Sequence, residues 1–117
     1  MALEYRRYKP EECEFVPVAL AEEVPPGERL LLTIGDIDVV VFNIAGQYFA
    51  IEDRCTHDDA PIGDGELEGY TLVCPRHGAR FDVRTGQVLA PPAPAPVPAF
   101  PVQVHDGRIE VGIPRQK

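Results

Sequence analysis

Two cysteines and two histidines of this chain lie at the two ends of one segment. The sequence reads Cys55-x-His57, then sixteen residues, then Cys74-x-x-His77. Thiolate sulfur and imidazole nitrogen are the side-chain ligands that zinc, copper and iron take most readily in proteins. The residue types and their spacing therefore predict a metal centre built from these four side chains.

The order of the ligands favours a centre with two metal ions. Zinc sites usually take one close pair of cysteines and one close pair of histidines, because each pair chelates a single ion. Here each pair is mixed, with one sulfur and one nitrogen. If each loop gives its sulfur to one iron and its nitrogen to the other, two loops hold two irons. This is the arrangement of a [2Fe–2S] cluster with two Cys on one iron and two His on the other.

The chain resembles the Rieske proteins, whose signature is C-x-H, a spacer of about this size, and C-x-x-H. The resemblance rests on "CTH" and "CPRHG", and extends through Phe81-Asp82 and "RTGQVLAPPAPAP". It implies one [2Fe–2S] cluster per chain, with Cys55 and Cys74 on one iron as thiolates. His57 and His77 are then neutral ligands of the other iron, at an exposed tip. The implied function is electron transfer, with no substrate chemistry of its own.

Two departures separate this chain from the Rieske proteins of membrane complexes. Those members carry an additional cysteine in each loop and join the two in a disulfide, whereas this chain has Ala60 and Arg76 there. They also have a serine and a tyrosine whose hydroxyls donate hydrogen bonds to the cluster and a ligand sulfur. Here the matching residues are Ala79 and Phe81. The resemblance therefore implies a reduction potential towards the low end of the Rieske range, on the order of −150 mV.

Low-potential members of this kind are the ferredoxin components of aromatic-ring dioxygenase systems. The resemblance implies a flavoprotein reductase as electron donor and a terminal oxygenase, or another redox protein, as acceptor. Seven acidic residues and one base, Arg54, lie between Glu52 and Glu68. We expect this acidic segment to dock basic partner surfaces at the cluster tip, with an attraction that weakens as salt rises. An ordinary solvated acidic loop is the alternative.

Two other functions fit part of the pattern. One is a Rieske-like small subunit or accessory of a larger oxidoreductase such as nitrite reductase, although such chains often lack the four ligands. The other is a structural zinc module for protein binding, since the ligand total is Cys₂His₂. A catalytic Rieske oxygenase is not expected, because 117 residues leave no room for a second, mononuclear iron domain.

The composition predicts one acidic domain over residues 1–117. A formal net charge of −8 argues against nucleic acid and anionic membranes as partners. The sequence shows neither an apolar run that could span a bilayer nor a basic-then-apolar leader, so we expect a soluble, cytoplasmic protein. The odd number of cysteines favours reduced thiols or metal thiolates, and Cys13 is expected to be a buried or partly buried structural thiol, to which no role is assigned.

The scaffold is predicted to be all-β, because short runs of β-branched and aromatic residues alternate with turn formers and no helical apolar period appears. Turns at Ala45-Gly46 and Asp106-Gly107 predict two hairpins. Phe42, Tyr48 and Phe49 are expected in the core. The resemblance implies a Rieske-like antiparallel β-sandwich with a cluster-binding tip of two loops. The predicted strands are 15–19, 29–34, 38–44, 47–52, 71–74, 79–83, 102–105 and 108–112.

The cluster-binding loops are predicted at approximately residues 53–69 and 74–82. The proline-rich segment 90–101 follows; it is either a polyproline spacer or, by analogy with the family, a loop that covers the cluster. Within the second loop, Pro75 should stiffen the backbone and Gly78 should let a backbone N–H point towards sulfur.

Overall fold

The strand β3 (Ile37–Ile44) forms the centre of the fold and separates two hydrophobic cores. Successive side chains of a strand point to opposite faces. Val39 and Val41 therefore pack on one side with residues of the C-terminal strand, while Val40 and Phe42 pack on the other with residues of the ligand loops. This almost continuous apolar run is typical of a strand buried on both faces.

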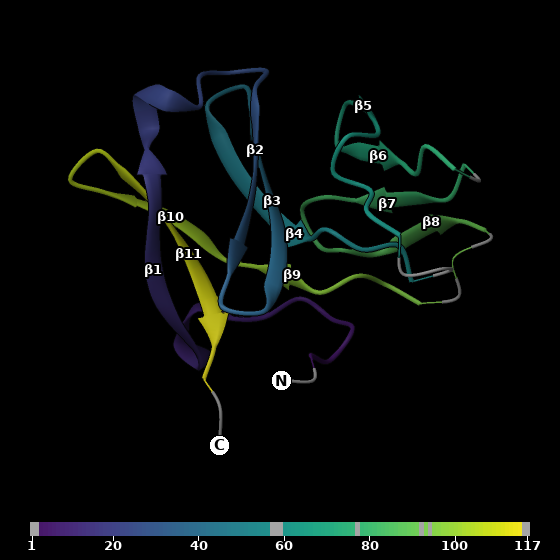
Figure 1. The fold of residues 1–117 in the computed structure, drawn as a ribbon, viewed down its shortest axis with the longest axis horizontal. Coiled ribbons are helices and arrows are strands. Elements are labelled where there is room, and N and C mark those ends of the chain that lie inside the picture. Colours follow the sequence, from purple (N-terminus) through teal and green to yellow (C-terminus); the bar gives the residue numbers. More distant parts are fainter. Residues whose placement is uncertain (1–2, 57–59, 77, 92, 94, 116–117) are drawn as a thin grey trace.

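The structure is a computed structural model that describes residues 3–56, 60–76, 78–91, 93 and 95–115. The predicted ligands His57 and His77 lie outside these residues. The described chain forms three antiparallel sheets. One of them, called the small sheet because each of its strands has only three residues, lies to one side of the two larger ones (Figure 1).

The two larger sheets make up the base of the molecule. The first has the order β1-β11-β10, and β1 is an edge strand that accommodates Pro17 beside a register shift. The second has the order β2-β3-β4-β9. The strands of these two sheets are β1 (Cys13–Leu20), β2 (Arg29–Ile34), β3, β4 (Gln47–Glu52), β9 (Ala99–Phe100), β10 (Val102–His105) and β11 (Arg108–Pro114).

The small sheet carries the loops that hold the predicted ligands. Its order is β5-β6-β7-β8, each strand pairing with the next along the chain. One ligand loop enters it from β4, and the other connects β6 to β7. The proline-rich segment leads from β8 back to β9 in the base. The strands are β5 (Glu66–Glu68), β6 (Thr71–Val73), β7 (Arg80–Asp82) and β8 (Val88–Ala90).

The all-β prediction is confirmed, and the predicted loops prove shorter than expected. The first loop ends at residue 65, because 66–68 pair with 71–73 as β5. The second ends at residue 79, because β7 begins at Arg80. The segment 90–101 includes strand β9, which pairs with β4. The strands β5, β8 and β9 have two or three residues each, too few to show an alternating pattern in the sequence.

Both predicted hairpin turns are present. Ala45 and Gly46 have φ values of 54° and 89°, and Asp106 and Gly107 have 53° and 74°. Positive φ at both central residues is the geometry of the type I′ turn, whose twist matches that of the flanking strands. Phe42 is buried as predicted, whereas Tyr48 and Phe49 are only half-buried.

Cys13 is buried in the core between the two larger sheets, as predicted. Burial raises the pKa of its thiol above the ordinary value. Two short 3₁₀ helices, η1 (Pro10–Glu12) and η2 (Ala21–Glu23), complete the described structure. No helix in the described part of the chain is long and apolar enough to cross a membrane.

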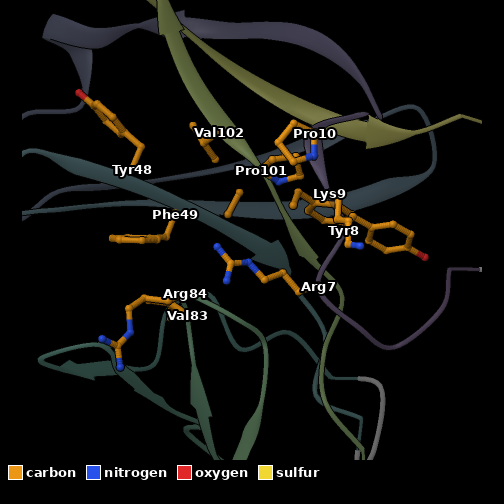
Figure 2. Close-up of a pocket in the computed structure, with 12 residues that line it drawn as sticks. Arg7, Tyr8, Lys9, Pro10, Tyr48, Phe49, Val83, Arg84, Pro101 and Val102 are labelled. Carbon is orange, nitrogen blue, oxygen red and sulfur yellow. The ribbon is translucent and has the colours of Figure 1, made fainter. Parts of the chain in front are cut away.

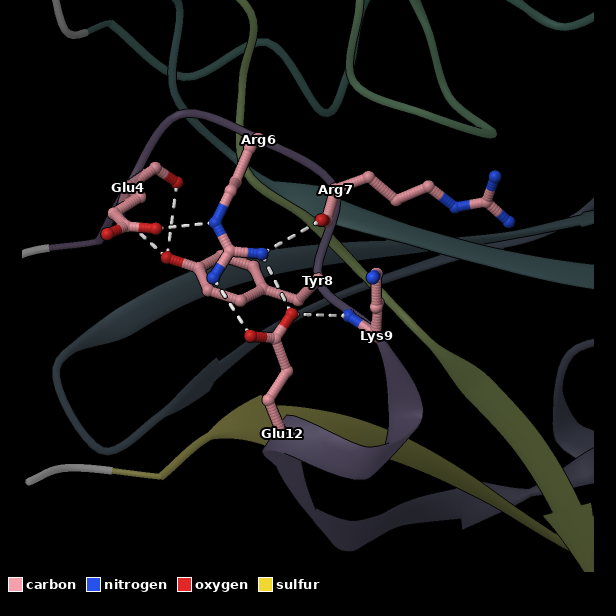
Figure 3. A network of polar contacts seen from close by, with 6 residues as sticks. All are labelled: Glu4, Arg6, Arg7, Tyr8, Lys9 and Glu12. Atoms are coloured by element: carbon pink, nitrogen blue, oxygen red, sulfur yellow. Dashed lines mark hydrogen bonds and ion pairs between the residues drawn. The ribbon is translucent and has the colours of Figure 1, made fainter.

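The N-terminal segment is held against the base by its backbone and by a polar network (Figure 3). The amide of Tyr8 donates to the carbonyl of Ala99 at 2.8 Å, and the amide of Ala99 donates to the carbonyl of Arg6 at 3.0 Å. The Arg6 guanidinium donates to both carboxylate oxygens of Glu12, at 2.8 and 2.9 Å. These hydrogen bonds lower the pKa of Glu12 to about 2. The carboxylate is therefore ionised, and the pair is intact, at neutral pH.

Candidate metal centre

Cys55 and Cys74 are the two predicted ligands that the structure describes, and both lie in one hydrophobic core. Their exposed fractions are 0% and 2%, and neither forms a disulfide. They share this core with Leu72, Phe81 and Val97. A bare thiolate in such surroundings is costly, because nothing replaces its water, whereas a thiolate bound to a metal ion has a positive partner. The donor type and the burial therefore fit the sulfur side of an iron–sulfur cluster.

The two ligand loops are closed in the same way. The amide of Cys55 donates to the carbonyl of Ala60 at 2.8 Å, and the amide of Cys74 donates to the carbonyl of Ala79 at 2.7 Å. In both loops the acceptor is five residues after the cysteine. Each closed segment contains one of the predicted histidines in its sequence. The backbone around each predicted pair of ligands is thus closed by the same type of hydrogen bond.

Gly78 gives the second loop a backbone conformation that few other residues adopt. Its φ of 76° lies in the left-handed region, where residues with a Cβ are strained. Its amide donates to the carbonyl of Cys74 at 3.1 Å. The amide of Gly78 itself therefore closes the turn, and the backbone N–H that points towards sulfur stays a prediction for the other amides of this loop.

The end of the first loop is fixed by two charged side chains that act on its backbone. The Asp53 carboxylate accepts hydrogen bonds from the amides of Ile62 and Gly63, at 2.8 and 2.6 Å. From β2, the Arg29 guanidinium donates to the carbonyls of Gly63 and Gly65, at 2.7 and 2.6 Å. We refer to Arg29 and Asp53 as the loop clamp. It holds the segment that follows the ligand pair of the first loop.

Sequence reasoning missed the loop clamp. By residue type Asp53 belongs with the acidic docking residues, and by its position in an apolar run Arg29 belongs to a strand. Arg29 lies 34 and 36 positions before the carbonyls that it binds. A separation of this length leaves no local signal in the sequence.

Arg29→Met is expected to shorten the lifetime of the bound cluster. Methionine keeps an apolar side chain of similar length but cannot donate to the two carbonyls. A hydrogen bond to a charged group is worth about 1.5–3 kcal/mol, and 1.4 kcal/mol is a tenfold change in an equilibrium. We therefore expect the loop to open, and the cluster absorbance to decay in the presence of a chelator, about tenfold faster or more.

The control for this experiment is Arg108→Met. Arg108 is exposed at the start of β11 and donates no side-chain hydrogen bond to either ligand loop within the described residues. Its replacement removes the same charge and should leave the decay rate unchanged. Equal decay rates in the two variants would show that the clamp does not retain the cluster.

The proline-rich segment packs against the first ligand loop. The Thr56 hydroxyl donates to the carbonyl of Ala95 at 2.6 Å. Ala93 and Val97 are buried in the core that contains both cysteines. These contacts favour the covering loop over a simple spacer, because a spacer has no need to bury apolar side chains beside the ligands.

The acidic segment is only partly available for docking. Glu52 pairs with Arg54 at 3.1 Å, and the Asp53 carboxylate is used in the loop clamp. Glu68 pairs with Arg80 at 2.9 Å. Three of the seven acids are therefore engaged in ion pairs or in the loop clamp. Asp64 and Glu66 are exposed, while Asp58 and Asp59 lie outside the described residues.

Comparison with known protein sequences agrees with this site. The sequence profile of the Rieske [2Fe–2S] domain matches residues 14–101. The chain is also 39% identical, over 99 residues, to the 3-phenylpropionate/cinnamic acid dioxygenase ferredoxin subunit of Escherichia coli (strain K12). That alignment covers 84% of this chain and 90% of the relative. The similarity therefore includes both ligand loops.

Comparison with solved structures leads to the same family. The ferredoxin of carbazole 1,9a-dioxygenase from Nocardioides aromaticivorans IC177 is 31% identical, with a TM-score of 0.79 over 86% of this chain and 98% of that one. A chain from the complex of reduced oxygenase and oxidized ferredoxin in carbazole 1,9a-dioxygenase is 30% identical, with a TM-score of 0.79 over 88% and 97% of the two chains. Since the sequence profile, the fold and the buried cysteine pair agree, this chain belongs to the Rieske [2Fe–2S] domain family.

Proposed function

We propose that the two ligand loops of this protein hold one [2Fe–2S] cluster and that residues 1–117 form a single Rieske domain. In this proposal Cys55 and Cys74 bind one iron as thiolates. His57 and His77 bind the other as neutral imidazoles. The observation that carries the proposal is the burial of both thiols in one core, at the start of two loops with the same backbone closure. When bound, the cluster accepts and releases one electron at a time.

The chain's own residues supply the surroundings that an electron carrier needs. The core around the cysteines, with Leu72 and Phe81 fully buried, excludes water from the sulfur side. The loop clamp and the contact between Thr56 and Ala95 restrict movement of the first loop. A rigid site changes little between oxidation states, so electrons are exchanged with little reorganisation.

The proposed partners follow from the relatives, which are ferredoxins of dioxygenase systems. We propose a flavoprotein reductase as donor and a terminal oxygenase, or another redox protein, as acceptor. Both dock at the cluster tip, with the exposed Asp64 and Glu66 of the acidic segment as their proposed contacts. The net charge of −8 makes nucleic acid and anionic membranes unsuitable partners. The three cysteines are free of disulfides, which fits a reducing, cytoplasmic location.

The test combines metal analysis with electron transfer. The purified protein is expected to be red-brown, with two irons and two sulfides per chain, and its reduced form should give the low average g value of a mixed-ligand cluster in electron paramagnetic resonance. It should accept electrons from a flavoprotein reductase and pass them to a terminal oxygenase. A colourless protein with one zinc would support the zinc module instead. A protein that transfers electrons only as part of a larger complex would support the accessory subunit.

A further inference from the structure

A groove of about 650 Å³ lies at the seam between the base and the small sheet, outside both ligand loops. Figure 2 shows that the Arg7 guanidinium points into this groove, towards Phe49 and Arg84. A second groove, of about 330 Å³, continues from it and shares Tyr48, Phe49 and Val102. The side chains that matter for the argument are Arg7, Lys9, Tyr48, Phe49, Arg84 and Val102.

Two open strand edges border the smaller groove. The strand β4 pairs with β9 only through Ala50 and Ile51, so residues 47–49 have no ladder partner on that side within the described chain. The strand β10 pairs only with β11 in the same part of the chain. Residues 46–49 and 102–104 line the groove between these edges. Unpaired strand edges bind extended peptides by backbone hydrogen bonds.

The larger groove is rich in positive charge. Arg84 is held in place by Asp82, at 3.1 and 2.9 Å, and by stacking 4.2 Å from the ring centre of Tyr70. Arg7 and Lys9 are exposed and make no ion pair with a carboxylate of the described residues. They belong to the N-terminal segment that the Arg6–Glu12 pair fixes (Figure 3). Arg7 and Lys9 are therefore exposed at the groove without a direct carboxylate partner among the described residues, and Arg7 lies within electrostatic reach of Asp82.

We propose that this continuous groove binds an extended acidic segment of a partner protein. The backbone of the segment adds to the open edge of β4, beside residues 102–104 of β10, and its carboxylates pair with Arg7 and Lys9. Its apolar side chains lie on Phe49 and Val102. The groove carries basic side chains, whereas the chain as a whole has a net charge of −8 and an acidic segment near the ligand pairs. A nucleic acid would be repelled by that overall charge, whereas a short acidic peptide carries too little charge to be excluded.

The inference goes beyond the proposed electron transfer. None of the groove residues belongs to the ligand loops, and only Phe100 and Pro101, at its end, belong to the proline-rich segment. A partner could therefore stay attached through an acidic segment while the cluster tip turns to a donor or an acceptor. Such a tether raises the effective concentration of the tip at its partner.

The test uses the cluster-loaded protein and a fluorescent peptide of alternating glutamate and leucine. Fluorescence anisotropy should show binding that weakens as salt rises, and a peptide with glutamine in place of glutamate should bind at least tenfold more weakly. The double variant Arg7→Glu with Lys9→Glu should also lose at least tenfold in affinity. The matched control, Arg108→Glu with Arg115→Glu, has the same charge change outside the groove and should bind as the unmodified protein does.

Three results would overturn the proposal. They are equal affinity losses in the two double variants, equal binding of the glutamine peptide, and competition by a single-stranded oligonucleotide at least as strong as that by unlabelled peptide. The visible spectrum of each variant shows whether the cluster is retained. If a variant loses peptide binding but keeps its cluster spectrum, the substitution has affected the groove and not the cluster. Its electron transfer is then measured in a separate assay.

Discussion

Cys74→Ala, like Cys55→Ala, is expected to yield a protein without a [2Fe–2S] cluster and without electron-carrying activity. Each thiol is proposed as one of four ligands, and no other cysteine lies in the same core. The loss should also lower stability, because metal binding free energy is coupled to folding where the ligands are part of the core. Iron and sulfide content per chain, together with the visible absorbance, measures the effect.

Cys13→Ala is the matched control, because Cys13 is equally buried but lies in the other core, with Tyr8 and Phe100. This variant should keep two irons and two sulfides per chain. Circular dichroism spectra of Cys74→Ala and of the unmodified protein without its cluster are then compared. Equal spectra show that the variant lost a ligand and did not misfold. A Cys74→Ala protein that still holds two irons would show that the assigned ligand set is wrong.

The second large effect concerns the reduction potential. The unmodified protein should titrate towards the low end of the Rieske range, on the order of −150 mV. The double variant Ala79→Ser with Phe81→Tyr should raise this value, because hydroxyl donors stabilise the added negative charge of the reduced state. Both positions are fully buried in the core that holds the cysteines, so water does not already supply these hydrogen bonds.

The size of the shift follows from the energy of one hydrogen bond. For a one-electron couple, a tenfold change in the equilibrium is about 59 mV. A hydrogen bond to a charged group is worth about 1.5–3 kcal/mol, so each new donor should raise the potential by at most roughly 60–130 mV. The upper limit applies only if the bond forms in the reduced state alone.

Phe81→Leu serves as the control for this experiment, because it changes the packing without adding a hydroxyl. A redox titration at fixed pH and salt should show little change in this variant. A strongly positive midpoint in the unmodified protein would contradict the low-potential assignment. A shift of the same size in Phe81→Leu would mean that packing, and not hydrogen bonding, sets the potential.

Features that depend on neighbouring residues could be predicted from the sequence. The mixed Cys–His pairs indicated the type of centre, because ligand chemistry depends on residue type and on short spacings. The turns at Ala45-Gly46 and Asp106-Gly107 were predicted correctly, because their geometry is set by two adjacent residues. Long strands such as β3 and β4 carry enough residues for their pattern to be read.

Features that depend on distant parts of the chain were decided only by the tertiary structure. The strand β9 has two residues, and pairing with β4 alone makes it a strand. The amide of Gly78 was used by a carbonyl of its own turn, which spacing could not show. Arg29 reaches backbone carbonyls of the first ligand loop from a strand in the base. Local preference selects turns and long strands, but a side chain finds a distant backbone partner only after the sheets have packed.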